Sequence, residues 1–288
     1  MYVIAGATGN TGSVAATTLL QRGAKVRALV RDPQRGERLR ALGAELAVGS
    51  VLDPVALSKA FAGARGAYLL VPPDLGTPEP LARGRAIVDA WLAALHSSGV
   101  EHVVVLSSIG AQHVEGTGPI KMLHLAERAL HAQAIPATFV RAAYFVENWG
   151  SALGPAENEG ILPSFHQPDV AFSMVATRDI GEMVAEALLD PARRHRVIEL
   201  AGPSDASPND VAAILGRILG RDLRTVHVAG DAIVTTLQSF GVSAAVAEQF
   251  REMAEALDSG HIAFEHPGSV IRGRTSIESV LRAMLGRS

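Results

Sequence analysis

The first half of the chain alternates short apolar runs with amphipathic stretches. Apolar runs bounded by turn residues are typical of buried parallel strands, and apolar residues every three or four positions are typical of helices. The pattern predicts strands over Tyr2–Ala5, Lys25–Val30, Glu45–Val48, Gly66–Val71, His102–Leu106 and Thr138–Arg141. It predicts helices between them, over Thr11–Arg22, Gln34–Leu42, Val55–Phe61, Leu81–Ser97 and Ile120–Ala132.

This regular order predicts an α/β fold built on a doubly wound parallel sheet of the Rossmann type. Strands that alternate with helices form a parallel sheet covered on both faces, and right-handed crossovers leave little freedom of topology. We expect this domain to occupy residues 1–150.

The pattern is looser after Asn148. Residues 150–168 are rich in glycine and proline, which indicates loops with short elements. Helices are predicted further on, together with a short strand over 197–200, at residues 179–189, 207–219, 232–257 and 276–285. We expect residues 151–288 to form a smaller α/β substrate-binding region, with residues 232–260 as a lid. The boundary is expected to be interleaved, because open α/β sheets bind ligands at the carboxyl ends of their strands.

Composition narrows the chemistry. Apolar residues make up 48% of the chain and charged residues 19%, as in ordinary globular proteins. The absence of cysteine excludes disulfides, thiolate metal sites and iron–sulfur clusters, and the histidine spacing predicts no metal. A net charge of −3 argues against nucleic acid as a partner. Neither a signal peptide nor an apolar run of about 20 residues is present, so we expect a cytoplasmic protein without a membrane partner.

A glycine-rich turn joins the first strand to the first helix. Gly6 permits a tight turn, Gly9 allows a pyrophosphate to approach the backbone, and Gly12 allows close packing of helix on strand. The free N–H groups and positive dipole end of the helix then favour phosphate. The turn predicts a dinucleotide site with contacts from Gly6, Thr8, Gly9, Asn10, Thr11 and Gly12.

Arg31 ends the second strand, where the cofactor ribose is expected. An arginine there favours the 2′-phosphate of NADP, whereas an acidic residue favours the 2′-hydroxyl of NAD. Asp32 fits the second description, but it also fits a helix cap before Pro33, which we favour. We therefore expect NADP(H) as the preferred cofactor, with NAD(H) as the alternative and Arg35 as a second phosphate contact.

The motifs together resemble the NmrA-like family of atypical short-chain dehydrogenases. The resemblance rests on the glycine loop and on the segments 29–33, 141–148, 177–181 and 273–278. It implies an NADP-preferring Rossmann fold with a small C-terminal substrate region. It also implies one of two functions, an NAD(P)H-dependent reductase, often of quinones or other carbonyls, or a redox-sensing regulator.

Ordinary short-chain dehydrogenases deliver a proton through a Tyr-x-x-x-Lys pair. The chain has three tyrosines, and the residues four positions after them are Gly6, Pro72 and Asn148. The pair is therefore absent, which counts against a nucleotide-sugar epimerase and a standard alcohol dehydrogenase.

Other residues near the expected cofactor are candidates for the role of the missing Tyr-x-x-x-Lys pair. Lys121 and His124 lie on the helix after the fifth strand, where they suit proton transfer or, for Lys121, the ribose; each also fits an ordinary helix surface. Pro72 and Ser107 end two strands and are expected beside the nicotinamide, although Ser107 also fits a simple cap. Residues after the sixth strand are expected to meet the substrate, with Tyr144 also a proton donor: Tyr144, Phe145, Asn148 and Trp149.

Two functions stay open. One is an NADPH-dependent oxidoreductase that reduces a small flat acceptor such as a quinone or enone, with the proton supplied by water, Lys121, His124 or Tyr144. The other is a cofactor sensor that conveys the redox state to a protein partner through the loops of residues 150–175. Calorimetry and turnover assays distinguish the two.

Overall fold

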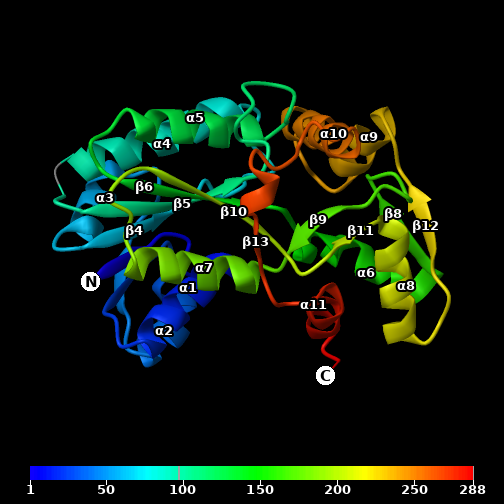
Figure 1. Cartoon of the computed structure of the whole chain (residues 1–288), viewed down its shortest axis with the longest axis horizontal. Helices are drawn as coiled ribbons and strands as arrows, with labels where there is room; N and C mark the ends of the chain where they lie inside the picture. Colours follow the sequence, from blue (N-terminus) through cyan, green and yellow to red (C-terminus); the bar gives the residue numbers. More distant parts are fainter. Residues whose placement is uncertain (97, 288) are drawn as a thin grey trace.

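The computed structural model of the chain describes residues 1–96 and 98–287. Within them an eight-stranded, all-parallel sheet runs through the left and centre of Figure 1. Its strand order is β13-β10-β6-β5-β4-β1-β2-β3. The strands are β1 Tyr2–Ile4, β2 Val26–Val30, β3 Glu45–Val48, β4 Gly66–Leu69, β5 His102–Ser108, β6 Ala137–Ala142, β10 Arg196–Ala201 and β13 Ile271–Arg272. The predicted doubly wound Rossmann-type sheet is confirmed.

Helices cover both faces of this sheet (Figure 1). One face carries α3 (Pro54–Phe61), α4 (Pro80–His96) and α5 (Ile120–His131). The other carries α1 (Asn10–Gln21), α2 (Glu37–Ala41) and α7 (Thr177–Leu189). Because side chains alternate along a strand, neighbours such as Val3 and Ile4 enter separate apolar cores on the two faces. The helix predicted to Ser97 is described to His96, and Ser97 lies outside the described residues.

The chain from Tyr144 onward contributes to two regions. Helix α7 and strands β10 and β13 complete the large sheet and its cover. The remaining elements lie beyond its carboxyl edge, where three-stranded and two-stranded sheets are formed by β7 Tyr144–Phe145, β8 Ile161–Ser164, β9 Phe172–Val175, β11 Asp205–Ala206 and β12 Arg224–His227. The helices of this region are α6 Leu153–Glu159, α8 Pro208–Leu219, α9 Asp231–Ser239, α10 Ala244–Asp258 and α11 Ile277–Met284.

Two local features differ from the sequence pattern. The helical stretch predicted over 232–257 is divided into α9 and α10, because Gly241 adopts a left-handed φ of +83° between them. The strands of the smaller sheets are two to four residues long, which is too short for a periodicity to show. None of the helices in the described part of the chain has the length and apolar character needed to span a membrane.

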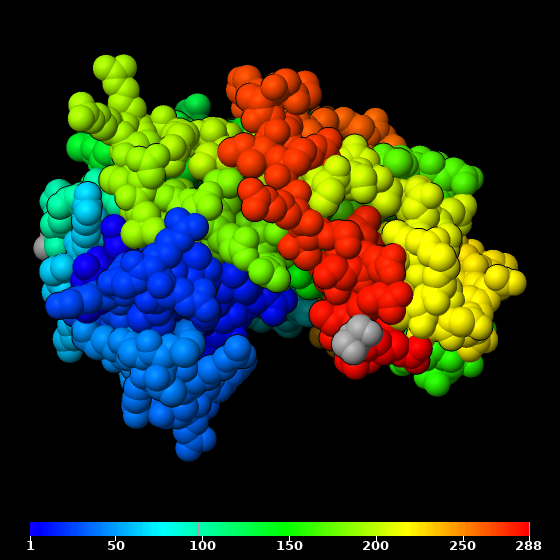
Figure 2. All heavy atoms as spheres, turned by 60° about the horizontal axis from the view of Figure 1, so that its bottom comes forward, coloured from blue at the N-terminus to red at the C-terminus, as the bar shows by residue number. Residues whose placement is uncertain are grey.

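Close packing of α7 on α1 joins the late segment to the N-terminal layer. Figure 2 shows α7, in yellow-green, lying against the blue N-terminal elements. Gly181 makes this approach possible, because a Cβ there would lie 2.6 Å from the carbonyl oxygen of Thr11 and against Val14. The same helix therefore packs directly behind the glycine loop.

Replacing Gly181 with alanine is expected to lower the free energy of unfolding by about 1–3 kcal/mol, because the added methyl group overpacks this contact. Urea unfolding followed by circular dichroism measures the change. Gly154→Ala in α6 is the matched control, since a Cβ at Gly154 meets nothing within 4 Å. Equal stability of the two variants would contradict the role given to Gly181.

Candidate functional site

The glycine loop has the geometry of a phosphate cradle. Gly6 has a left-handed φ of +60°, and its carbonyl accepts the N–H of Gly9 at 2.9 Å. A Cβ on Gly12 would overlap the Gly6 carbonyl oxygen, so the turn admits only glycine there. Gly9 precedes α1 and offers no side-chain cap, which leaves the first N–H groups of a 12-residue helix to an external acceptor.

The polar side chains of the loop take different directions. The Thr11 hydroxyl lies 2.9 Å from the phenol oxygen of Tyr68, in the buried layer between helix and sheet. Burial raises the pKa of Tyr68 well above its ordinary value, so this hydrogen bond is between neutral groups. Thr11 therefore has only its backbone N–H for a phosphate, whereas Asn10 is exposed and Thr8 is partly exposed.

A basic cavity lies beside this loop. Its volume is about 300 Å³, and it is lined by Thr8, Arg31, Asp32 and Arg35. Asp32 accepts the N–H of Gln34 at 2.9 Å, which confirms it as a helix cap. Both arginines are exposed, and neither forms an ion pair within residues 1–96 and 98–287. These two guanidinium groups, beside a carboxylate that is occupied as a helix cap, form a pocket suited to a phosphate.

The next two strand ends are tied to neighbouring side chains. The carbonyl of Pro72 accepts the guanidinium of Arg83 at 3.3 Å. The Ser107 hydroxyl donates to Oε1 of Glu127 at 2.6 Å and is buried. This places the Ser107 side chain in a polar interior rather than in open space at the sheet edge.

A buried ion pair organises that interior. Arg141 on β6 donates to both oxygens of Glu127 on α5, at 3.0 and 2.7 Å, and also to Glu265. Burial acts to lower the pKa of Arg141, but the bonds to the two carboxylates outweigh it and raise the pKa above the ordinary value. Glu199 on β10 then accepts the N–H groups of Glu265 and His266 at 2.7 and 2.8 Å. These contacts join three strands of the sheet to the C-terminal segment.

The two candidates on α5 have separate partners. The ammonium of Lys121 lies 2.9 Å from a carboxylate oxygen of Glu252 on α10, and both side chains are half-buried. His124 donates from Nδ1 to the carbonyl of Ala111 at 2.8 Å. That bond leaves Nε2 of His124 as the atom for external chemistry.

The residues after β6 form an aromatic cluster. Tyr144 packs edge-on against Trp149, His166 and Phe172, with ring centroids 6.4, 5.2 and 5.4 Å away. Burial raises the pKa of Tyr144 to about 12, although a bond to Asn148 acts to lower it. The other predicted substrate residues divide between the interior and solvent: Phe145 is half-buried, Trp149 is buried, and Asn148 is exposed.

Several contacts of this region join residues distant in the chain. Glu252 lies 131 positions from Lys121, and Asp258 lies 92 positions from its partner His166. No spacing in the sequence marks such pairs, so the sequence analysis did not find them. Among the described residues, no hydrogen bond joins Tyr144 to Lys121 or His124.

Two acidic residues, from the motif segments 141–148 and 177–181, hold the C-terminal region in place through hydrogen bonds. Glu147 accepts the N–H and hydroxyl of Thr177, at 2.9 and 2.6 Å, at the start of α7. Asp179 in turn accepts the N–H and hydroxyl of Thr275, at 3.0 and 2.6 Å. These two motifs therefore hold α7 and the C-terminal segment in place.

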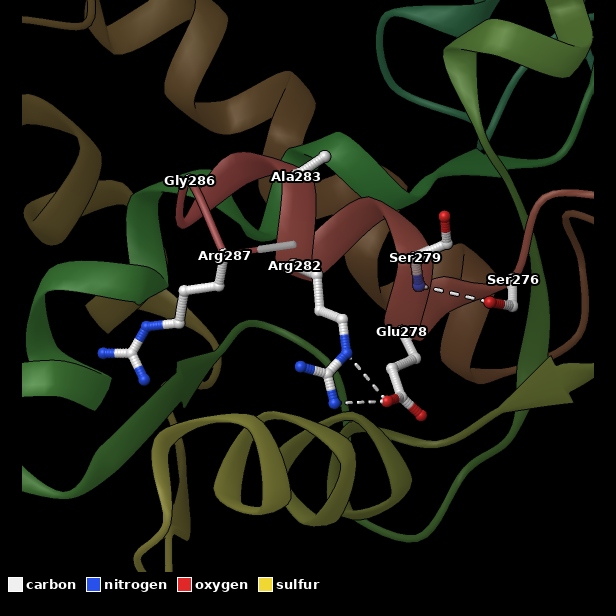
Figure 3. Close-up of a pocket in the computed structure, with 7 residues that line it drawn as sticks. All are labelled: Ser276, Glu278, Ser279, Arg282, Ala283, Gly286 and Arg287. Carbon is white, nitrogen blue, oxygen red and sulfur yellow. Dashed lines mark hydrogen bonds and ion pairs between the residues drawn. The ribbon is translucent and has the colours of Figure 1, made fainter.

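A larger cavity of about 610 Å³ lies elsewhere, along α11 (Figure 3). The figure shows Arg282 bonded to Glu278, 2.8 Å apart, with Arg287 further along the same segment. The cavity is lined by Ser276, Glu278, Ser279, Arg282, Ala283, Gly286 and Arg287, of which only Ser276 and Glu278 belong to a segment that carries the family resemblance. Its arginines are already paired, so it offers less to an anion than the pocket at Arg31.

Comparison with known proteins identifies the family of this chain. A family model described as the NmrA-like family matches residues 2–279. The chain belongs to this family. A relative, (4-alkanoyl-5-oxo-2,5-dihydrofuran-3-yl)methyl phosphate reductase from Streptomyces griseus, is 30% identical to this chain, over 90% of this chain and 88% of that protein.

Two further comparisons concern one enzyme of Escherichia coli. Its quinone oxidoreductase 2 is 23% identical over 88% of this chain and 86% of that protein. The crystal structure of NADPH-dependent quinone oxidoreductase QOR2 complexed with NADPH superposes with a TM-score of 0.82, at 20% identity, over 99% of this chain and 100% of that one. The family resemblance drawn from the motifs is confirmed.

Glu127→Gln is expected to lower the free energy of unfolding by about 3–5 kcal/mol, because it leaves the buried Arg141 charge without its main partner. Thermal and urea unfolding measure this loss. Glu265→Gln is the control at the other end of the same guanidinium. Its side chain is 42% exposed, so a change of about 0–1 kcal/mol is expected. Equal losses of unfolding free energy in the two variants would contradict the role of Glu127 as the main partner of Arg141.

Proposed function

We propose that this NmrA-like protein is an NADPH-dependent oxidoreductase that reduces a small flat conjugated acceptor such as a quinone or an enone. The observation that carries the proposal is the glycine cradle beside a pocket with two arginines that form no ion pair in the described part of the chain. Phosphate at a helix N-terminus and a second phosphate on guanidinium groups account for both features at once.

The residues of the cradle fit the cofactor by chemistry. The backbone N–H groups of Asn10, Thr11 and Gly12 would hold the pyrophosphate, and Arg31 and Arg35 the 2′-phosphate. Pro72 would meet the nicotinamide through its backbone at the strand ends where it lies in such folds, and Ser107, whose buried hydroxyl is bonded to Glu127, would contribute its backbone there. The QOR2 structure, which was crystallised with NADPH, supports this choice, while NAD(H) remains the alternative.

The acceptor class rests on the aromatic cluster and on the relatives. Tyr144, Phe145 and Trp149 offer apolar faces to a flat ring, and Asn148 adds an exposed amide. The two relatives named above act on a quinone and on a dihydrofuranone phosphate, which supports a conjugated acceptor here. Helix α10, which contacts α5 through Glu252, would act as the lid that excludes water.

The reduced nicotinamide, when bound, supplies a hydride, and this chain must orient the acceptor and deliver a proton. Lys121 can orient the ribose, since Glu252 holds its ammonium at the start of α5. Nε2 of His124 is available for proton transfer. Tyr144, whose pKa is about 12, is neutral at pH 7 and serves better as a wall with a hydrogen-bonding hydroxyl.

Steady-state assays with NADPH and a panel of quinones and enones test the proposal. Turnover with at least one class is expected, with calorimetry on the same protein confirming NADPH binding. Tight binding of NADPH without turnover of any acceptor would contradict the enzyme and would instead describe a cofactor sensor.

Arg31→Ala is expected to weaken NADPH binding by roughly 10- to 100-fold, because a charge-assisted hydrogen bond contributes about 1.5–3 kcal/mol. Binding of NADH, which lacks the 2′-phosphate, is expected to change little. Arg178→Ala is the control, since Arg178 is also exposed but forms an ion pair with Glu182 on its own helix α7. Equal weakening for both cofactors would contradict a 2′-phosphate site at Arg31.

A further inference from the structure

The aromatic cluster at Tyr144 contains a buried histidine paired with a carboxylate. His166 lies in the loop between β8 and β9, and Asp258 is the last residue of α10. Nδ1 of His166 is 3.1 Å from Oδ1 of Asp258, and the two side chains are only 4% and 8% exposed. Neither residue carries any of the roles argued above.

The pair is held rigidly on both sides. Oδ2 of Asp258 accepts the N–H of Gln167 at 2.8 Å, so both carboxylate oxygens have partners. The hydroxyl of Ser164 accepts the N–H of His166 at 3.0 Å and donates to its carbonyl at 2.9 Å. The loop therefore presents the imidazole in one orientation. With Nδ1 directed to the carboxylate, the ring keeps its proton there and leaves Nε2 for another partner.

The free edge of the ring lies next to the predicted substrate residues. Nε2 makes no hydrogen bond within the described residues, and the ring is buried, with its side chain only 4% exposed. The ring lies edge-on to Tyr144, with an interplanar angle of 89°, and 4.7 Å from Phe172. The groups that face it are thus one carboxylate from α10, one neutral phenol from β7 and an apolar ring from β9.

We propose that His166 is the proton donor of the reductase and that Asp258 is its positioning residue. The proposal rests on the proposed function. In the step, the N–H bond at Nε2 breaks and an O–H bond forms on the acceptor oxygen that receives negative charge. The hydride from NADPH provides the electron pair, so the acceptor gains two electrons and two hydrogens. His166 is left neutral with its remaining proton on Nδ1, which is still donated to Asp258, and a proton from solvent restores the N–H bond at Nε2.

This geometry suits proton donation better than that of the other candidates. A carboxylate on Nδ1 fixes the tautomer and the orientation of the ring, so that Nε2 is the atom directed to a partner. His124 has only a backbone carbonyl at that position, and the ammonium of Lys121 is paired with Glu252. Tyr144 is a weaker acid, with a pKa of about 12.

Kinetics of three variants test the donor. His166→Gln and Asp258→Asn are expected to lower kcat by roughly 100-fold or more, the usual contribution of a general acid, and to leave the Kd of NADPH unchanged. The limb of the pH–rate profile that reports the acid is expected to disappear in His166→Gln. Added imidazole is expected to restore part of the rate in His166→Ala. His131→Gln, which removes an exposed histidine at the far end of α5, is the control and is expected to match the wild type.

A purely structural link between α10 and the loop gives different results. It predicts lower thermal stability, an unchanged pH profile and no rescue by imidazole, and this set of results would overturn the donor role. A pH profile altered by His124→Gln but not by His166→Gln would overturn it as well. A wild-type protein without turnover on any acceptor would overturn the proposed function and the donor role together, so the two failures are distinct.

Nuclear magnetic resonance of the histidine rings gives a readout without cofactor. His124 and His166 are both expected in the Nδ1–H form when neutral, and the signal of His166 is the one that is lost in His166→Gln and shifted in Asp258→Asn. An Nε2–H form for this ring would overturn the assignment, because it would place a lone pair against the carboxylate.

Discussion

The buried bond between Arg141 and Glu127 is the constraint on which the arrangement of the site depends. A guanidinium at 6% exposure is stable only with paired charge, and its two carboxylates come from α5 and from the C-terminal segment. The Ser107 hydroxyl at the end of β5 shares Glu127. The strand ends that would face the cofactor, the helix that carries Lys121 and His124, and the last part of the chain are therefore fixed to one another through a single cation.

Backbone proximity fixes the other half of the site. Gly12 lies against Gly6, and Gly181 lies against Thr11 and Val14, so the first turns of α1 are packed between the glycine loop and α7. Glu147 caps α7, and Asp179 on α7 holds Thr275. The chain after the first domain therefore supports the phosphate cradle as well as covering it.

The sequence predicted the parts of this arrangement that depend on local pattern. The strands and helices of the first half, the glycine loop and the cap at Asp32 are all written in consecutive residues. Pairs such as Lys121 with Glu252 have no local pattern, because contact across the fold depends on how α10 crosses the sheet edge. The small strands β7 and β11 were not predicted for another reason, since an element of two residues carries no periodicity. Ser107 fitted a simple cap in the sequence, whereas its true partner is a carboxylate 20 residues away.

Helix α10 makes the long-range contacts that the sequence pattern could not predict. Ser243, just before it, donates its N–H to the carbonyl of Leu75 at 2.8 Å and its hydroxyl to that of Thr77 at 2.6 Å, in the loop after β4. Glu252, in the middle of α10, contacts Lys121 of α5, and Asp258, at the end of α10, contacts His166 in the loop between β8 and β9. One helix thus touches three segments at the carboxyl edge. Since its two charged contacts end on Lys121 and His166, which can each carry a proton, this one helix both ties the segments together and supplies the carboxylates beside these two side chains.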